Sequence, residues 1–345
     1  MSAPIPPGAL PVTFHGRARD YFGIWITNLL LTLVTIGLWS AWAKVRRLRY
    51  FYGNTEAAGG SLDYTARPWS ILLGRVLVVG ILGLVALVET ASPFASVPVG
   101  LASLALLPWL VNRSLRFNAR MTLWQAVRFD FRGTYGAAAK VHLGWPLASA
   151  VSLGILLPFA TRASGRYWVN HRFLGTARFA SLPPMGPFYA ALLQAGLVMG
   201  LAFATCGAAG AAVFMGLGGE FQEAEELGAA LTVSFLPAFL LARVFYRTRA
   251  RAILLNHLTL EEGHRFVCRL SALRYTWIVA TNAVATLLTL GFAHPWTAVR
   301  AWRYQCSCLW ILPAGAIDTF ISKQREAGSA FASEFADLEG FDIGV

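Results

Sequence analysis

The sequence is poor in charged residues and in cysteine. Only 13% of its 345 residues are Asp, Glu, Lys or Arg, whereas 56% are hydrophobic. Soluble domains carry roughly 25% charged residues, so this chain has too few charges to cover the surface of a soluble protein of its length. The composition also excludes a disordered or collagen-like chain, and four cysteines are too few for a disulfide scaffold. The remaining class is a polytopic membrane protein.

Sequence motifs for chemistry are missing as well. The sequence contains no nucleophile elbow, phosphate-binding glycine loop or dinucleotide fingerprint. Residues 257–264 hold two His and two Glu, but their spacing fits no helical zinc site. We therefore expect no catalytic residue, no metal and no cofactor, and we expect that the protein is not an enzyme. Nucleic acid is not an expected partner, because the cations follow the ends of apolar runs and form no separate basic domain.

Lys and Arg are absent from two long stretches, 76–112 and 179–242. Cytoplasmic loops of membrane proteins carry an excess of Lys and Arg. The two stretches are therefore predicted to form transmembrane helix pairs, at about residues 69–111 and 187–245, whose turns face the periplasm. Four acids fall in the second turn, namely Glu220, Glu223, Glu225 and Glu226. The Lys and Arg residues behind the net charge of +12 are then predicted to form a basic belt on the cytoplasmic face.

A 39-residue unit occurs three times without gaps, at 12–50, 129–167 and 266–304. Each unit opens with a short alternating segment that could pair as a strand, such as Val12–Phe14. An apolar helix, a break and a basic aromatic helix follow. The break residues allow a turn or remove a helix hydrogen bond; they are Gly37, Gly154, Gly291, Pro158 and Pro295.

The units raise a topological problem, because cations flank both ends of the first two apolar helices. A re-entrant hairpin on the cytoplasmic side satisfies the charge rule; a kinked full span is the alternative, and both stay open. The predicted fold is an all-α polytopic membrane protein, with three broken-helix repeats between two helix pairs and room for short cytoplasmic strands. Residues 1–321 are expected to form one membrane domain, and residues 322–345 an acidic, mobile tail.

Candidate binding residues recur in the three units. An arginine followed by a tyrosine ends each copy: Arg49, Tyr50, Arg166, Tyr167, Arg303 and Tyr304. If the units pack around a pseudo-threefold axis, three guanidinium groups would hold phosphate or carboxylate groups. The alternative is a topogenic cluster with an aromatic anchor. Arg75 is a further candidate, since it lies inside an apolar span, although it could also snorkel to the interface.

The run Leu33–Thr55 contains Trp42-Ala43-Lys44-Val45-Arg46-Arg47-Leu48-Arg49-Tyr50-Phe51 followed by Asn54-Thr55. This run resembles the YjgN family of bacterial inner-membrane proteins, which is classed as a domain of unknown function. The resemblance extends from about Phe14 to Phe320 and implies a multi-pass protein of the bacterial inner membrane. It implies no activity, substrate or catalytic residue.

Two functions are consistent with these observations. The first is a transporter or channel-like protein for a small or lipid-like anionic solute, with its site where the broken helices meet. The second is a non-transporting, membrane-organising protein whose repeated Arg-Tyr belts bind anionic lipid headgroups. Both make an anionic bilayer the expected partner, and the first adds a small anionic solute.

Overall fold

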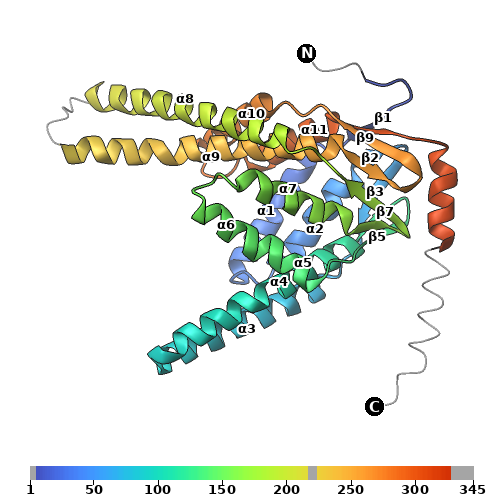
Figure 1. Cartoon of the computed structure of the whole chain (residues 1–345), viewed down its shortest axis with the longest axis horizontal. Helices are drawn as coiled ribbons and strands as arrows, with labels where there is room; N and C mark the ends of the chain where they lie inside the picture. The colour runs from blue at the N-terminus through green and yellow to red at the C-terminus, as the bar shows by residue number, and fades with distance from the viewer. Residues whose placement is uncertain (1–4, 217–223, 328–345) are drawn as a thin grey trace.

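The strands form a closed antiparallel β-barrel, which lies at one end of the molecule, on the right in Figure 1. The computed structural model describes residues 5–216 and 224–327, and within them ten short strands form the barrel. The strands are β1 (Leu10–Phe14), β2 (Thr55–Ala57), β3 (Gly60–Tyr64), β4 (Thr122–Trp124), β5 (Val127–Phe131), β6 (Arg172–Leu174), β7 (Ala177–Ser181), β8 (Leu258–Leu260), β9 (His264–Cys268) and β10 (Leu309–Leu312). Each strand pairs with the next one along the chain, and β1 pairs with β10 to close the barrel.

The connections between strands alternate between tight turns and helical hairpins. β2–β3 and β4–β5 are joined by two-residue turns, Ala58–Gly59 and Gln125–Ala126, in which both residues have positive φ. Such turns match the twist of antiparallel strands. Because the strands run alternately up and down, all tight turns lie at one end of the barrel and all helical connections at the other.

Five helical hairpins form these connections. They are α1 (Ala18–Val34) with α2 (Ser40–Gly53); α3 (Pro68–Ala91) with η1 (Pro93–Ala95) and α4 (Ser96–Arg120); α5 (Tyr135–Ala139), η2 (Lys140–Gly144) and α6 (Trp145–Val151) with α7 (Leu157–Asn170); α8 (Gly186–Gly216) with α9 (Ala224–Asn256); and α10 (Ala272–Leu288) with α11 (His294–Ser307). Each hairpin leaves one strand and returns to the next, so both of its ends lie at the barrel.

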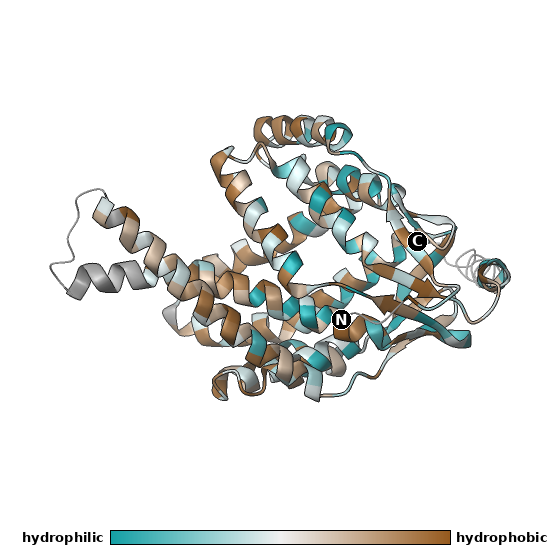
Figure 2. Cartoon of the chain, turned by 90° about the horizontal axis from the view of Figure 1, so that it is seen from above, coloured by the Kyte–Doolittle hydropathy of each residue, from teal (hydrophilic) through white to brown (hydrophobic). Residues whose placement is uncertain are grey.

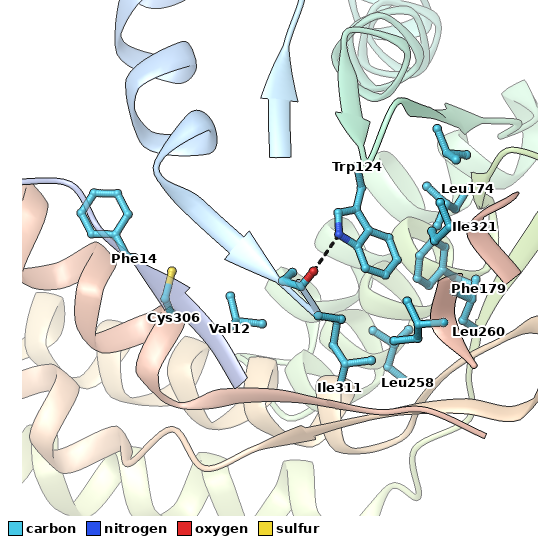
Figure 3. Packing of buried hydrophobic residues seen from close by; sticks show 14 of the residues in the cluster. Val12, Phe14, Trp124, Leu174, Phe179, Leu258, Leu260, Cys306, Ile311 and Ile321 are labelled. Carbon is cyan, nitrogen blue, oxygen red and sulfur yellow. Dashed lines mark hydrogen bonds between the residues drawn. The ribbon is translucent and has the colours of Figure 1, made fainter. Parts of the chain in front are cut away.

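Apolar side chains of the strands pack inside the barrel in one cluster with side chains of α1, α2 and α11 (Figure 3). Successive side chains of a strand point to opposite faces, which places Leu174 and Phe179 inward. A last described helix, 317–327, lies beside the barrel (Figure 1) and adds Ile317, Phe320 and Ile321 to the same cluster. This helix closes the tight-turn end, and residues 322–327 of the predicted tail belong to it. Residues 328–345 lie outside the described part.

Hydrophobic residues cover the helices that project from the barrel (Figure 2). Most exposed large apolar side chains belong to these helices or to the hairpin turns; Leu73 and Leu193 are 67% and 72% exposed. Two helices within the described residues, Pro68–Thr90 and Gly186–Val213, are long and apolar enough to cross a membrane. Their apolar surface needs a bilayer or another apolar partner.

The predicted all-α polytopic fold is wrong, because ten strands close into a barrel and only two of the described helices qualify as spans. The expected strand segment Val12–Phe14 lies in β1, but the sequence analysis did not foresee a barrel. The break expected in each of the three 39-residue units is present as a turn. The turn separates α1 from α2, α6 from α7 and α10 from α11, and the chain then returns to the barrel.

Candidate functional site

The three predicted helix breaks are tight turns with the same backbone hydrogen bond. Gly37, Gly154 and Gly291 have φ of +88°, +89° and +95°. Each donates its N–H to the carbonyl oxygen five residues earlier, at 2.7–2.8 Å, a bond that ends a helix with a left-handed residue. Pro158 and Pro295 lie in the first turn of α7 and α11, where a missing N–H leaves no helix bond unmade. Both prolines therefore start a helix.

The three repeated arginines lie at the bases of the broken hairpins. Arg49 Nε donates to the carbonyl oxygen of Tyr64 at 3.1 Å, and Arg303 Nη2 donates to that of Gly16 at 2.9 Å. Arg166 Nε is buried and has no hydrogen-bond partner within the described residues. None of the three lines either of the cavities described below. Binding of one ligand by the three arginines together stays a prediction.

The three tyrosines that follow these arginines fasten the second helix of each hairpin. The Tyr50 hydroxyl donates to the carbonyl oxygen of Arg17 at 2.7 Å. The Tyr167 hydroxyl bonds to the side-chain oxygen of Asn112. The Tyr304 hydroxyl lies 3.3 Å from the backbone nitrogen of the residue that caps α10. Their position at the hairpin bases is structural, and their role in ligand binding stays a prediction.

A cavity of about 1480 Å³ extends from the barrel lumen to the space between α7, α8 and α9. Its volume exceeds the roughly 300–1,000 Å³ of most small-molecule sites. Its lumen end is lined by Val12, Ala57, Leu62, Trp124, Phe129 and Phe179. Its outer end is lined by Leu157, Trp168, Leu193, Met199, Phe239 and Tyr246. The cavity therefore joins the barrel interior to α8, one of the two candidate spans.

Four arginines line this cavity, and no Asp or Glu is among its described lining residues. Arg243, Arg247 and Arg251 recur every fourth residue of α9, so they share one face of the helix. Arg251 donates to the side-chain oxygen of Gln305 on α11. The fourth arginine, Arg172, begins β6.

Arg172 is an inward-facing charge at the mouth of the barrel. It lies two residues before Leu174, whose side chain belongs to the lumen core, and side chains two apart share a face. Arg172 keeps access to solvent, but desolvation by the surrounding atoms lowers its pKa, and the nearby Tyr52 hydroxyl acts in the opposite direction. A guanidinium nevertheless stays charged at neutral pH. No acid pairs with it among the described residues, so its charge is available to a ligand in the cavity.

A second cavity, of about 480 Å³, lies among α1, α2, α3 and α11. Its polar lining includes Tyr21, Asn28, Ser40, Lys44, Arg47 and Arg75. Arg75, the predicted intramembrane cation, donates to Ser40 Oγ. The cavity therefore gathers three cations, and no acid is among its described lining residues.

Arg75 was a predicted candidate, whereas the other cavity cations counted only among the charges of the predicted cytoplasmic belt. The four-residue spacing on α9 was a usable signal, because it predicts one charged helix face. The described residues hold no group of three or more His, Cys, Asp or Glu side chains that could bind a metal ion.

The model of a family described as "Bacterial protein of unknown function (DUF898)" matches residues 9–338. Three relatives carry the name "Inner membrane protein YjgN". The protein of Escherichia coli O157:H7 is 29% identical over 150 residues, which are 43% of this chain and 38% of the relative. The protein of Escherichia coli strain K12 is 28% identical over 150 residues, which again are 43% of this chain and 38% of the relative. That of Salmonella typhimurium strain LT2 is 29% identical over 148 residues, 42% of this chain and 37% of the relative.

The matched region thus spans about two fifths of the length of these curated relatives. No solved structure matches the chain. The relatives support an inner-membrane location, and their names state no ligand or activity.

Proposed function

This chain belongs to the DUF898 family of bacterial proteins of unknown function, and from its own geometry we propose that it binds a lipid-like anion in the large cavity. The observation that carries this proposal is the continuity of the cavity. It runs from a helix long enough to cross a membrane into a charged barrel mouth and an apolar lumen. A molecule with one anionic group and long apolar parts fits that sequence of surfaces.

The apolar lining favours a hydrocarbon ligand. Leu193 and Met199 of α8 line the outer end of the cavity, and Leu62 and Phe129 line the lumen end. Each methylene group that leaves water for such a surface contributes about 0.8 kcal/mol. Leu193 is also 72% exposed, so its side chain is free to contact a hydrocarbon chain in the cavity.

The arginines favour an anionic headgroup at the barrel mouth. Arg172 lies between the lumen and the outer part of the cavity, and Arg243 and Arg247 line the wall on α9. Guanidinium groups bind phosphate and carboxylate oxygens with two parallel hydrogen bonds. Arg49 and Arg303 already donate to backbone carbonyls, so the cavity arginines are better placed to hold the headgroup.

In the proposed membrane arrangement, the helix pairs α3–α4 and α8–α9 cross the bilayer and the turns of the three broken hairpins enter it. The residue before each turn glycine supports this, since Ile36, Leu153 and Leu290 are apolar and at least 90% exposed. The shared turn geometry supports the three 39-residue units as one repeated building block. The barrel, beside most of the cations, would lie on the cytoplasmic side. The acidic loop at 220–226, expected in the periplasm, lies outside the residues with described side chains.

Solute transport stays a prediction. Helix 317–327 closes one end of the lumen, so a ligand cannot pass through the barrel along its axis. This closure favours a binding or holding function over conduction through the barrel. A transporter would have to release its ligand through the same side of the cavity or by movement of this helix.

The test uses Gly196→Trp, which places an indole in the cavity. Gly196 lines the cavity, and a Cβ there meets no atom within 4 Å. Gly200→Trp is the matched control, since Gly200 is equally uncrowded, lies one turn further along α8 and is not a lining residue. Native mass spectrometry of the purified full chain should detect bound anionic lipid in the wild type and in Gly200→Trp, with about tenfold less in Gly196→Trp. Equal lipid in all three proteins would contradict the proposal.

A further inference from the structure

We propose that the smaller cavity, among α1, α2, α3 and α11, is a separate binding site for a phosphate group. This site does not depend on the large cavity, with which it shares no lining residue. The phosphate would be either free phosphate or the phosphomonoester group of a lipid such as phosphatidic acid, and the two sources share the recognition chemistry argued below.

The charge of the cavity is the main argument. Lys44 and Arg47 are three residues apart on α2, so their side chains lie on one face of the helix. Arg75 of α3 lines the same space. No described acid lines it, so three positive charges face one another without a counterion. An anion in the cavity would replace this repulsion with attraction.

The state of Lys44 agrees with this arrangement. Burial, followed by the charges of Arg75 and Arg47, lowers the pKa of Lys44. Lys44 also makes no ion pair among the described residues. These surroundings therefore destabilise the ammonium group, and a bound anion would offset both effects.

Hydrogen bonds orient the site, and neutral donors complete it. Arg75 donates to Ser40 Oγ, a bond that holds the guanidinium group against the first turn of α2. The Trp39 indole donates to Asn28 Oδ1 at 3.2 Å, so the amide NH₂ of Asn28 is left to donate to a ligand. The Tyr21 side chain lies on the same wall.

The number of cations favours phosphate over a carboxylate. A phosphate monoester carries a charge of about −1.5 to −2 at neutral pH, whereas a carboxylate carries one negative charge and has two acceptor oxygens. The cavity, about 480 Å³, holds a phosphate and several waters of roughly 30 Å³ each. Cations inside candidate spans, such as Arg75, are also typical of functional sites.

Isothermal titration of inorganic phosphate into the detergent-solubilised full chain tests the proposal, with Lys44→Gln and Arg75→Gln as variants. Arg46→Gln is the control, because Arg46 is on the same helix but packs over the Trp39 ring and does not line the cavity. Each charge-assisted bond removed should weaken binding by at least tenfold, while Arg46→Gln should bind as the wild type does. Lys44→Gln keeps the test decisive if Arg75→Gln fails to fold, since it breaks no ion pair.

A second arm repeats the measurement with phosphatidic acid, a phosphomonoester lipid, in nanodiscs. If free phosphate does not bind but the phospholipid does, and only the cavity variants weaken it, the phosphate comes from a lipid headgroup. The proposal is overturned if neither probe binds saturably, or if Arg46→Gln weakens binding as much as the cavity variants do. Gly196→Trp should leave phosphate binding unchanged, so failure here is distinguishable from failure of the large-cavity proposal.

Discussion

Trp124 Nε1 donates a hydrogen bond of 3.0 Å to the carbonyl oxygen of Ala57 (Figure 3). The bond joins β4 to β2 past the strand between them, β3. Both residues line the large cavity and belong to the packed lumen core. The Trp124 indole therefore forms part of the boundary at which the open cavity meets the closed end of the barrel.

Trp124→Phe should destabilise the protein. The substitution removes the indole donor and leaves the Ala57 carbonyl oxygen buried without this bond, at a cost of about 1–3 kcal/mol. Denaturant unfolding in detergent measures the change. Trp277→Phe is the control, since Trp277 is 66% exposed on α10. Equal stability of the two variants would mean that the indole bond does not hold the barrel.

Ile321→Ala should loosen helix 317–327 from the barrel. The Ile321 side chain is 2% exposed and packs in the lumen cluster, and such truncations cost about 2–5 kcal/mol. Thermal unfolding and protease cleavage near residue 316 report the effect. Ser322→Ala changes an exposed neighbour on the same helix and should behave as the wild type. If both variants resist protease equally, the helix does not depend on this contact.

Gly154→Ala should destabilise the turn between α6 and α7 by about 1 kcal/mol. Gly154 has φ of +89°, a conformation that a side chain makes unfavourable. Gly23→Ala should instead stabilise by about 0.5–1 kcal/mol, because Gly23 lies inside α1 with open space around its Cβ position. Denaturant unfolding should therefore show a lower midpoint for Gly154→Ala and a higher midpoint for Gly23→Ala than for the wild type. Midpoints that move in the same direction would contradict the turn geometry.

Cys306 should react slowly with a maleimide at pH 8 in the folded protein. Burial raises the pKa of the Cys306 thiol from an ordinary value of 9.0 to about 11. A higher pKa means less thiolate, by about a hundredfold for a shift of two units. Mass spectrometry of the labelled peptide measures the rate, and unfolded protein, in which the thiol regains its ordinary pKa, gives the reference. Similar rates in both states would show that the thiol is accessible.

The sequence predicted the helices better than the barrel. Long apolar runs mark α3 and α8, and Gly37, Gly154 and Gly291 mark the turns. Strands of three residues, such as β2 and β6, carry too little alternation to be recognised. Their partners are also set by the hairpins inserted between them, so closure depends on contacts between residues far apart in the chain.

The candidate sites were also only partly predictable, because the sequence shows the neighbours of a residue along the chain but not the cavity that it faces. Arg75 stood out because its neighbours are apolar. Arg172 and Lys44 did not, since both follow apolar runs and therefore resemble topogenic charges. Only the three-dimensional arrangement shows that they face cavities.

The most direct test of the account compares Arg172→Gln with Arg265→Gln in the binding of a fluorescent anionic phospholipid. Both arginines are exposed, but Arg172 lines the cavity, whereas Arg265 on β9 lies next to inward-facing Phe266 and therefore on the outer face. The account predicts that Arg172→Gln weakens binding by at least tenfold, that Arg265→Gln does not, and that a zwitterionic analogue binds all three proteins weakly. Equal affinity of Arg172→Gln and the wild type for the anionic lipid would contradict it.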